Sequence, residues 1–280
     1  MQIDAHQHFW RISRGDYWWL RPDLAGLYRD FVPSQLKPHL RKHGIERTIL
    51  VQAAPTIAET QFMLDLAREA DFVAGVVGWV DFAAPDAAKI IDELAKDELL
   101  VGLRPMVQDI ADDDWLLRAD LARAVDAMQA HGLVFDALTL PRHLSRLLVF
   151  IDRHPGLALV IDHCSKPHIR DRRYDPWRAD MAAVAARPHV MCKLSGLATE
   201  ASADWSAADL KTPFRHVLDM FGANRLIWGS DWPVVNLAGG YDRWRETALD
   251  LLAPLGAQER AAILGGNAQR LYLSKRGRRP

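Results

Sequence analysis

The chain opens with the stretch Gln2-Ile3-Asp4-Ala5-His6-Gln7-His8, a short apolar run that ends in two histidines. Seven similar runs follow along the chain, and amphipathic stretches of helical period separate them. This alternation is typical of repeated βα units around a parallel sheet. The predicted strands cover residues 2–8, 47–53, 73–80, 99–105, 133–138, 157–163, 189–194 and 225–231.

Helices are predicted between these strands over residues 34–43, 57–70, 87–96, 115–130, 177–186 and 212–221. Gly44 and Gly132 follow two of them, as glycine often does at the end of a helix. Eight strands with intervening helices close into a (β/α)8 TIM barrel, and the 280 residues are close to the roughly 250 typical of that fold. A doubly wound open sheet is the alternative, but no glycine-rich turn follows the first strand. We therefore predict a single α/β barrel domain over residues 1–274 and a basic tail over residues 275–280.

Composition narrows the classes of partner. The chain has 35 basic and 36 acidic residues, so its net charge of -1 does not favour a nucleic acid or a membrane surface. The apolar runs are much shorter than the about 20 residues of a membrane span, and the N-terminus lacks the pattern of a secretory signal. A cytoplasmic location is expected, and the sequence leaves the oligomeric state open. Cys164 and Cys192 lie in apolar runs and are expected to be buried, reduced thiols.

Catalytic groups of a TIM barrel project from the C-terminal ends of its strands, and several predicted strands end in polar residues. His6 and His8 are two residues apart on a strand, so both side chains can point into the barrel mouth. Gly229 and Asp231 share a face of the eighth strand, which neighbours the first in a closed barrel. His163 ends the sixth strand. Three imidazoles and a carboxylate are ligands that Zn2+ uses, with a position left for a water.

Other strand ends offer groups that could bind a substrate. Arg104 ends the fourth strand, where a buried guanidinium is costly unless it is paired or meets a ligand. Gln52 and Lys193 end the second and seventh strands, and a structural ion pair is the alternative role for Lys193. Trp10 follows the first strand and could present a flat apolar wall to a sugar ring. The aromatic segment 16–20 is a candidate lid over the site.

Four segments carry a resemblance to a known family. They are Asp4-Ala5-His6-Gln7-His8-Phe9-Trp10, Ile161-Asp162-His163-Cys164-Ser165-Lys166-Pro167, Trp228-Gly229-Ser230-Asp231-Trp232-Pro233 and Gly266-Asn267-Ala268-Gln269-Arg270-Leu271-Tyr272. Together they resemble the amidohydrolase superfamily, and more narrowly its branch of sugar-lactone hydrolases, which includes L-fuconolactonases and L-rhamnonolactonases. The resemblance implies a reaction centre of His6, His8, His163 and Asp231. No counterpart of the lysine that bridges two metals in binuclear members is evident, which implies at most one Zn2+, and some lactonases of this branch work without a metal.

The resulting expectation is a lactonase that opens a small sugar lactone to its sugar acid. Asp231 would take a proton from water and later deliver it to the leaving ring oxygen. His6, His8 and His163 would stabilise the oxyanion, directly or through one Zn2+ held with Asp231. Arg104, Gln52, Lys193 and Trp10 would bind the sugar. Two alternatives stay open at this point, a Zn-dependent decarboxylase of the same superfamily and a noncatalytic sugar-binding barrel.

Overall fold

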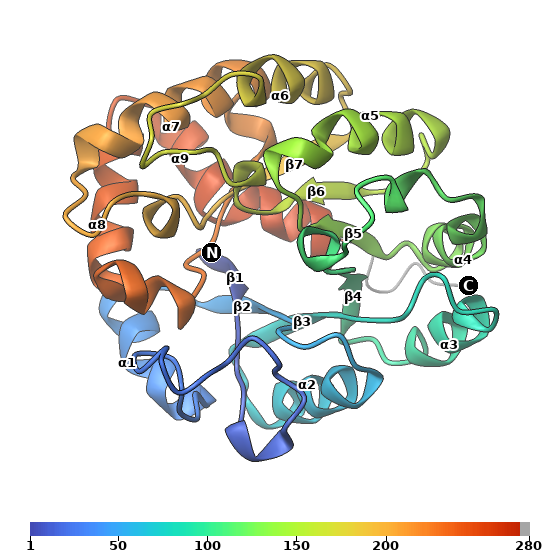
Figure 1. Cartoon of the computed structure of the whole chain (residues 1–280). Helices are drawn as coiled ribbons and strands as arrows, with labels where there is room; N and C mark the ends of the chain where they lie inside the picture. Colours follow the sequence, from blue (N-terminus) through green and yellow to red (C-terminus); the bar gives the residue numbers. More distant parts are fainter. Residues whose placement is uncertain (275–280) are drawn as a thin grey trace.

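The computed structural model describes residues 1–274, in which eight parallel strands form a barrel inside a ring of helices (Figure 1). The strands pair in sequence order from the first to the eighth, and every pair is parallel. All eight predicted strands and the (β/α)8 architecture are confirmed. The strands are β1 (Ile3–Gln7), β2 (Arg47–Val51), β3 (Val73–Gly78), β4 (Leu100–Leu103), β5 (Val134–Ala137), β6 (Leu159–Ile161), β7 (Val190–Leu194) and β8 (Leu226–Trp228).

The helices follow the predicted pattern with four main differences. Gly44 and Gly132 end α1 and α4 in left-handed conformation, as predicted. The predicted helix over 115–130 is helical only in its second half, because two short 3-10 turns precede α4. Helices α5, α8 and α9 were not predicted. The helices are α1 (Pro33–His43), α2 (Ile57–Glu69), α3 (Ala87–Leu94), α4 (Ala122–His131), α5 (Leu144–Arg153), α6 (Trp177–Ala185), α7 (Ala207–Phe221), α8 (Gly240–Leu252) and α9 (Ala257–Ala261).

The barrel closes between β1 and the residues that follow β8. The amide of Asp231 donates to the carbonyl of His6 at 2.8 Å, and the amide of His8 donates to the carbonyl of Trp232 at 2.7 Å. Gly229 makes this approach possible, because a Cβ atom at that position would lie 2.6 Å from the Cβ of His6. The seam therefore brings the two predicted histidines of β1 beside the predicted carboxylate of strand eight.

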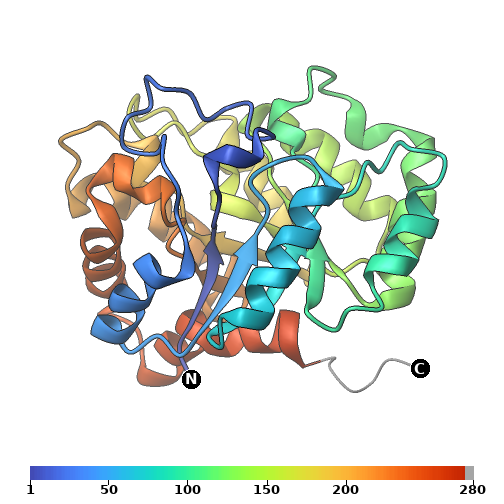
Figure 2. The ribbon, with the colours of Figure 1, turned by 90° about the horizontal axis from the view of Figure 1, so that it is seen from below.

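The apolar core has two parts, as expected for a barrel whose strands are buried on both faces. A large cluster packs the strands against the helices, and a smaller one fills the barrel interior. The interior cluster uses alternate residues of a strand, such as Ile3 and Ala5 or Ile49 and Val51. Tyr272, from the last helical segment, closes this interior cluster at the end of the barrel where the chain begins. Figure 2 shows that helical segment lying across this end of the barrel. The opposite end is left for the site.

Three further predictions concern the chain as a whole. Cys164 and Cys192 are buried and free, as predicted. In residues 1–274, no helix has the length and apolarity needed to cross a bilayer. The basic tail predicted over 275–280 lies outside the described residues, so its separation from the barrel domain stays a prediction.

Candidate active site

A pocket with a volume of about 210 Å³ lies at the C-terminal ends of the strands. Two imidazoles, two cations and two carboxylates reach it, and apolar side chains complete the wall. A concave site of this composition is the usual setting for binding a small polar molecule. The lining residues are His8, Trp19, Ala53, Arg104, Met106, Gln108, Asp109, Leu138, His163, Lys166, Asp231 and Val234.

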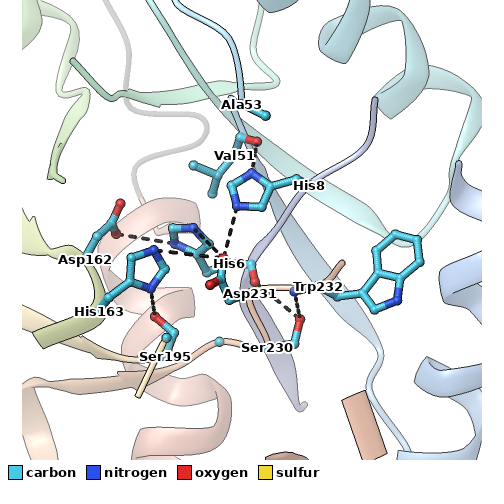
Figure 3. Close-up of polar contacts among 12 residues, drawn as sticks. His6, His8, Val51, Ala53, Asp162, His163, Ser195, Ser230, Asp231 and Trp232 are labelled. Carbon is cyan, nitrogen blue, oxygen red and sulfur yellow. Dashed lines mark hydrogen bonds and ion pairs between the residues drawn. The ribbon is translucent and has the colours of Figure 1, made fainter. Parts of the chain in front are cut away.

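Asp231 is the centre of the polar contacts at the base of the pocket (Figure 3). Its Oδ1 atom lies 3.2 Å from Nε2 of His8, 3.7 Å from Nε2 of His6 and 4.0 Å from Nε2 of His163. The backbone of Asp231 is left-handed, with a φ of 59°, which turns the side chain from the end of β8 toward the histidines. The four residues predicted as the reaction centre are thus brought together.

The electrostatics of this cluster keep Asp231 ionised. Burial by itself would raise the pKa of the carboxyl group, but the neighbouring His163, together with His8 and His6, holds that pKa below its ordinary value. Burial also lowers the pKa of His163 to about 4, so this imidazole is neutral at pH 7. An ionised carboxylate beside a neutral imidazole can accept a proton from a water molecule at pH 7.

His8 is held by the neighbouring strand. Its Nδ1 atom lies 2.7 Å from the carbonyl oxygen of Val51, at the end of β2. Because a carbonyl only accepts hydrogen bonds, Nδ1 carries a hydrogen, and Nε2 is the atom that faces Asp231. Gln7, between the two histidines, points away from the site and donates to Oγ1 of Thr48 at 3.1 Å. The alternation predicted for this strand is confirmed.

His163 reaches the site from a turn rather than from a strand. Strand β6 ends at Ile161, and the residues from His163 to Lys166 all have left-handed backbone, with φ values between 51° and 57°. The prediction that His163 ends the sixth strand is therefore wrong in its geometry, although it placed the residue at the correct end of the barrel. Nδ1 of His163 lies 2.9 Å from Oγ of Ser195, which follows β7 and fixes the orientation of the ring.

A buried ion network lies behind the histidines. The ammonium group of Lys193 is 2.5 Å from Asp136 and 3.0 Å from Asp162, and it lies 3.2 Å from Nδ1 of His6. Asp162 also contacts Nη1 of Arg104 at 3.3 Å. Tyr272 closes the network from below by donating to Asp136 at 2.9 Å. The network fixes His6 from behind, and its opposite charges compensate one another in the barrel interior.

Of the four residues predicted to bind substrate, one lines the pocket and three lie outside its wall. Arg104 lines the pocket, as predicted. Gln52 does not line it and instead holds Arg104, because its Nε2 donates to the Arg104 carbonyl at 2.9 Å and its Oε1 accepts from Nη2 at 3.1 Å. Lys193 is fully buried in the ion network, which is the alternative role considered for it. Trp10 is also fully buried and donates from Nε1 to the carbonyl of Arg29 at 2.8 Å. Gln52, Lys193 and Trp10 thus do not line this pocket, and their contact with a substrate stays a prediction.

Several lining residues were missed because they come from loops. Gln108, Asp109 and Met106 follow β4, and Lys166 follows β6. Trp19 belongs to the segment 16–20 that was predicted as a lid, and its Nε1 donates to the carbonyl of Ala53 at 2.7 Å, which holds the loop against the pocket. The sequence signal for Lys166 was its position three residues after His163.

Three of the predicted metal ligands form a compact donor set. The ligand atoms of His6, His163 and Asp231 all lie within 4.8 Å of one another, and the three residues are buried. Two imidazole nitrogens and one carboxylate oxygen are donors that Zn2+ accepts, and three protein ligands leave a position for water. The residues therefore fit one divalent ion. His8 lies outside this compact set, although its Nε2 atom faces Asp231, and its predicted role as a fourth ligand stays a prediction.

Comparison with known proteins agrees with this arrangement. A family model described as Amidohydrolase matches residues 3–273. The chain is 48% identical to an L-fucono-1,5-lactonase of Burkholderia ambifaria, over 97% of this chain and 95% of that protein. It is 40% identical to an L-fucono-1,5-lactonase of Burkholderia multivorans, over 97% of this chain and 96% of that protein.

Solved structures show the same fold. A crystal structure of an amidohydrolase from Burkholderia multivorans with bound zinc superposes with a TM-score of 0.92 at 40% identity, covering 97% of this chain and 99% of that one. A 5-carboxyvanillate decarboxylase from Sphingomonas paucimobilis superposes with a TM-score of 0.66 at 15% identity, covering 97% of this chain and 98% of that one. The second likeness shows a shared fold only.

Proposed function

Because this chain belongs to the amidohydrolase family, we propose that it is a lactonase that hydrolyses L-fucono-1,5-lactone or a closely related sugar lactone to the sugar acid. The observation that carries the proposal is the ionised Asp231 carboxylate at the base of a small polar pocket, surrounded by three imidazoles. The two L-fucono-1,5-lactonases at 48% and 40% identity support the substrate class. A cytoplasmic location is part of the same proposal.

Lactone hydrolysis needs an activated water and a stabilised oxyanion. Asp231 removes a proton from the water, whose oxygen attacks the carbonyl carbon of the lactone. His8 and His163 line the pocket, and they stabilise the carbonyl oxygen as it gains negative charge. When the bond between the carbonyl carbon and the ring oxygen breaks, Asp231 returns the proton to that oxygen. His6 is behind the pocket wall and orients the Asp231 carboxylate.

We include a single Zn2+ ion, held by His6, His163 and Asp231, in this proposal. The chemistry of the donor set and the zinc-containing structure of the Burkholderia multivorans amidohydrolase support it. A bound Zn2+ would act as a Lewis acid on the lactone carbonyl.

Arg104 bears on the alternative of a decarboxylase. Such an enzyme would use the guanidinium to hold the carboxylate of its substrate. Both terminal nitrogens of Arg104 are instead engaged by protein groups, Nη1 by Asp162 and Nη2 by Gln52. The two L-fucono-1,5-lactonases at 48% and 40% identity favour the lactone, whereas the likeness to a decarboxylase at 15% identity shows the fold alone. Product analysis separates the two reactions, because a lactonase acidifies the medium without loss of carbon and a decarboxylase releases CO2.

The test is the substitution Asp231→Asn, which keeps the shape of the side chain and removes its basicity. We expect kcat for L-fucono-1,5-lactone, followed by proton release, to fall by about 10²–10⁴-fold while the lactone still binds. Asp81→Asn is the matched control, because Asp81 follows β3 at the same end of the barrel but does not line this pocket. Near-normal hydrolysis by the Asp231 variant would remove the basis of the mechanism. A panel of aldonolactones, assayed with and without chelator, then defines the sugar and the ring size.

A further inference from the structure

Lys166 lines the pocket, and its ammonium group makes no hydrogen bond or ion pair with any part of residues 1–274. The other cation of the pocket, Arg104, is held by Asp162 and Gln52. A lysine side chain carries a compact charge on a flexible stem, and it can reach a ligand without first breaking an internal ion pair. Lys166 is therefore a cation available to whatever occupies the pocket.

The backbone places this cation beside the reaction centre. Residues His163, Cys164, Ser165 and Lys166 have φ values of 52°, 51°, 57° and 51°, and the amide of Lys166 donates to the carbonyl of His163 at 2.8 Å. A turn closed in this way has about three residues per turn, so side chains three residues apart lie on the same side. His163 and Lys166 are the two members of the turn that line the pocket.

Such a turn is energetically unfavourable for residues other than glycine. Left-handed backbone costs each of them free energy relative to the right-handed form, and four in succession are unusual outside functional sites. The charge of Lys166 also acts on the reaction centre. Burial is the main reason why the pKa of His163 is low, and the positive charge of Lys166 lowers that pKa further. The conformation of the turn thus serves to present an imidazole and an ammonium group to one ligand.

The chemistry of the proposed reaction indicates what the ammonium group meets. A lactone is neutral, whereas its hydrolysis adds one water, breaks the bond between the carbonyl carbon and the ring oxygen, and leaves a hydroxyl group and a carboxylic acid. The acid releases a proton at neutral pH and becomes a carboxylate. A fixed cation attracts this full negative charge much more strongly than it attracts the dipole of the lactone.

We propose that Lys166 is a further substrate-contacting residue, whose ammonium group binds the carboxylate that forms when the lactone opens. The inference rests on the proposed lactonase function. It assigns to Lys166 a selective contact with the product and with the negatively charged states that precede it, while the neutral substrate is held by the remainder of the pocket.

The test compares product affinity with substrate affinity. The inhibition constant of sodium L-fuconate and the KM for L-fucono-1,5-lactone are measured for the wild type, Lys166→Met and Lys166→Arg. In the Met variant we expect the inhibition constant to rise at least about tenfold and KM to change less than about threefold. The Arg variant retains the charge and should keep the inhibition constant within about threefold of the wild-type value. Lys89→Met removes the same charge from the exposed surface of α3 and should match the wild type.

The outcomes are distinguishable from those that test the reaction itself. A wild-type protein that does not hydrolyse the lactone overturns the proposed function and this inference with it. If the wild type is active but Lys166→Met keeps its affinity for L-fuconate, the inference alone is wrong. A parallel rise of both constants would also overturn it, because a merely structural role affects substrate and product equally. Lys166→Gln replaces the Met variant if the latter does not fold.

Discussion

Replacing Gly196 by alanine should displace His163 and lower activity, and the structure supplies a control for the backbone strain that the change introduces. Gly196 has a φ of +66°, and a Cβ atom there would lie 2.6 Å from Nδ1, 2.7 Å from Cγ and 2.8 Å from Cβ of His163. Gly44 has a similar φ of +63° in left-handed backbone, but a Cβ atom there would meet nothing within 4 Å. Both substitutions therefore force an alanine to adopt a positive φ, but only Gly196→Ala places a methyl group against His163.

The magnitudes follow from this pair. Left-handed backbone costs an alanine about 1–2 kcal/mol in either variant. Gly196→Ala adds an overpacking cost of about 1–3 kcal/mol. To restore ordinary contact, the His163 ring must move from 2.6 Å to at least 3.4 Å from the new methyl group. A displacement near 1 Å at a reacting group can lower the rate by about 10²-fold.

Stability and activity are measured on both variants. Urea unfolding at pH 7 gives the free energy of unfolding, and proton release from L-fucono-1,5-lactone gives kcat/KM. We expect Gly44→Ala to lose about 1–2 kcal/mol of stability and to keep the activity of the wild type. Gly196→Ala should lose more stability and about 10²-fold in kcat/KM. If the activities of the two variants agree within threefold, the position of His163 is not what this contact maintains, and the reasoning is refuted.

Three further predictions concern buried groups. Burial raises the pKa of Asp4 to about 6, so the folded protein keeps a proton that the unfolded chain releases near pH 4, and stability should fall as the pH rises through this range. By pH 7.5 the wild type should have lost about 3 kcal/mol of its free energy of unfolding in this way, and Asp4→Asn should not show this loss. Urea titrations at several pH values measure it, and parallel pH profiles for the two proteins would contradict the prediction. Lys193→Met removes the cation shared by the buried carboxylates of Asp136 and Asp162 and should cost about 3–5 kcal/mol in the same assay. A raised KM at unchanged stability would instead indicate substrate binding. Because His8 lies outside the compact donor set, elemental analysis after Zn2+ loading should find one equivalent in His8→Ala and none in His163→Ala. Equal loss in both variants would show that His8 is a ligand as well.

The strands could be predicted because burial on both faces makes each of them a short apolar run. Helix α5 carried a recognisable signal, since its buried residues Leu144, Leu147, Phe150 and Ile151 have helical spacing. Helix α8 begins at Gly239-Gly240, a pair that resembles a turn, and tertiary packing decides its start. Helix ends were predictable where a glycine followed the helix.

The reaction centre could be predicted from strand ends, but the pocket wall could not. His6 lies in β1, His8 directly follows it, and Asp231 follows β8. The relative position of these two strands follows from their order in a barrel. Lys166 and Trp19 come from loops, and contacts distant in sequence determine the path of a loop. Lys193 illustrates a different difficulty. Its position at a strand end was predicted correctly, but only the structure shows that Asp136 and Asp162 occupy its ammonium group.

The seam between β1 and β8 links the maturation of the enzyme to the completion of its chain. The imidazoles of His6 and His8 are synthesised first, whereas the carboxylate of Asp231 follows only with the last strand, and its amide itself closes the barrel on the His6 carbonyl. A nascent chain that lacks strand eight has neither a closed barrel nor a base. Lactone turnover therefore reports the final step of folding directly, and recovery of activity during refolding should coincide with closure of the barrel rather than with the earlier formation of helices.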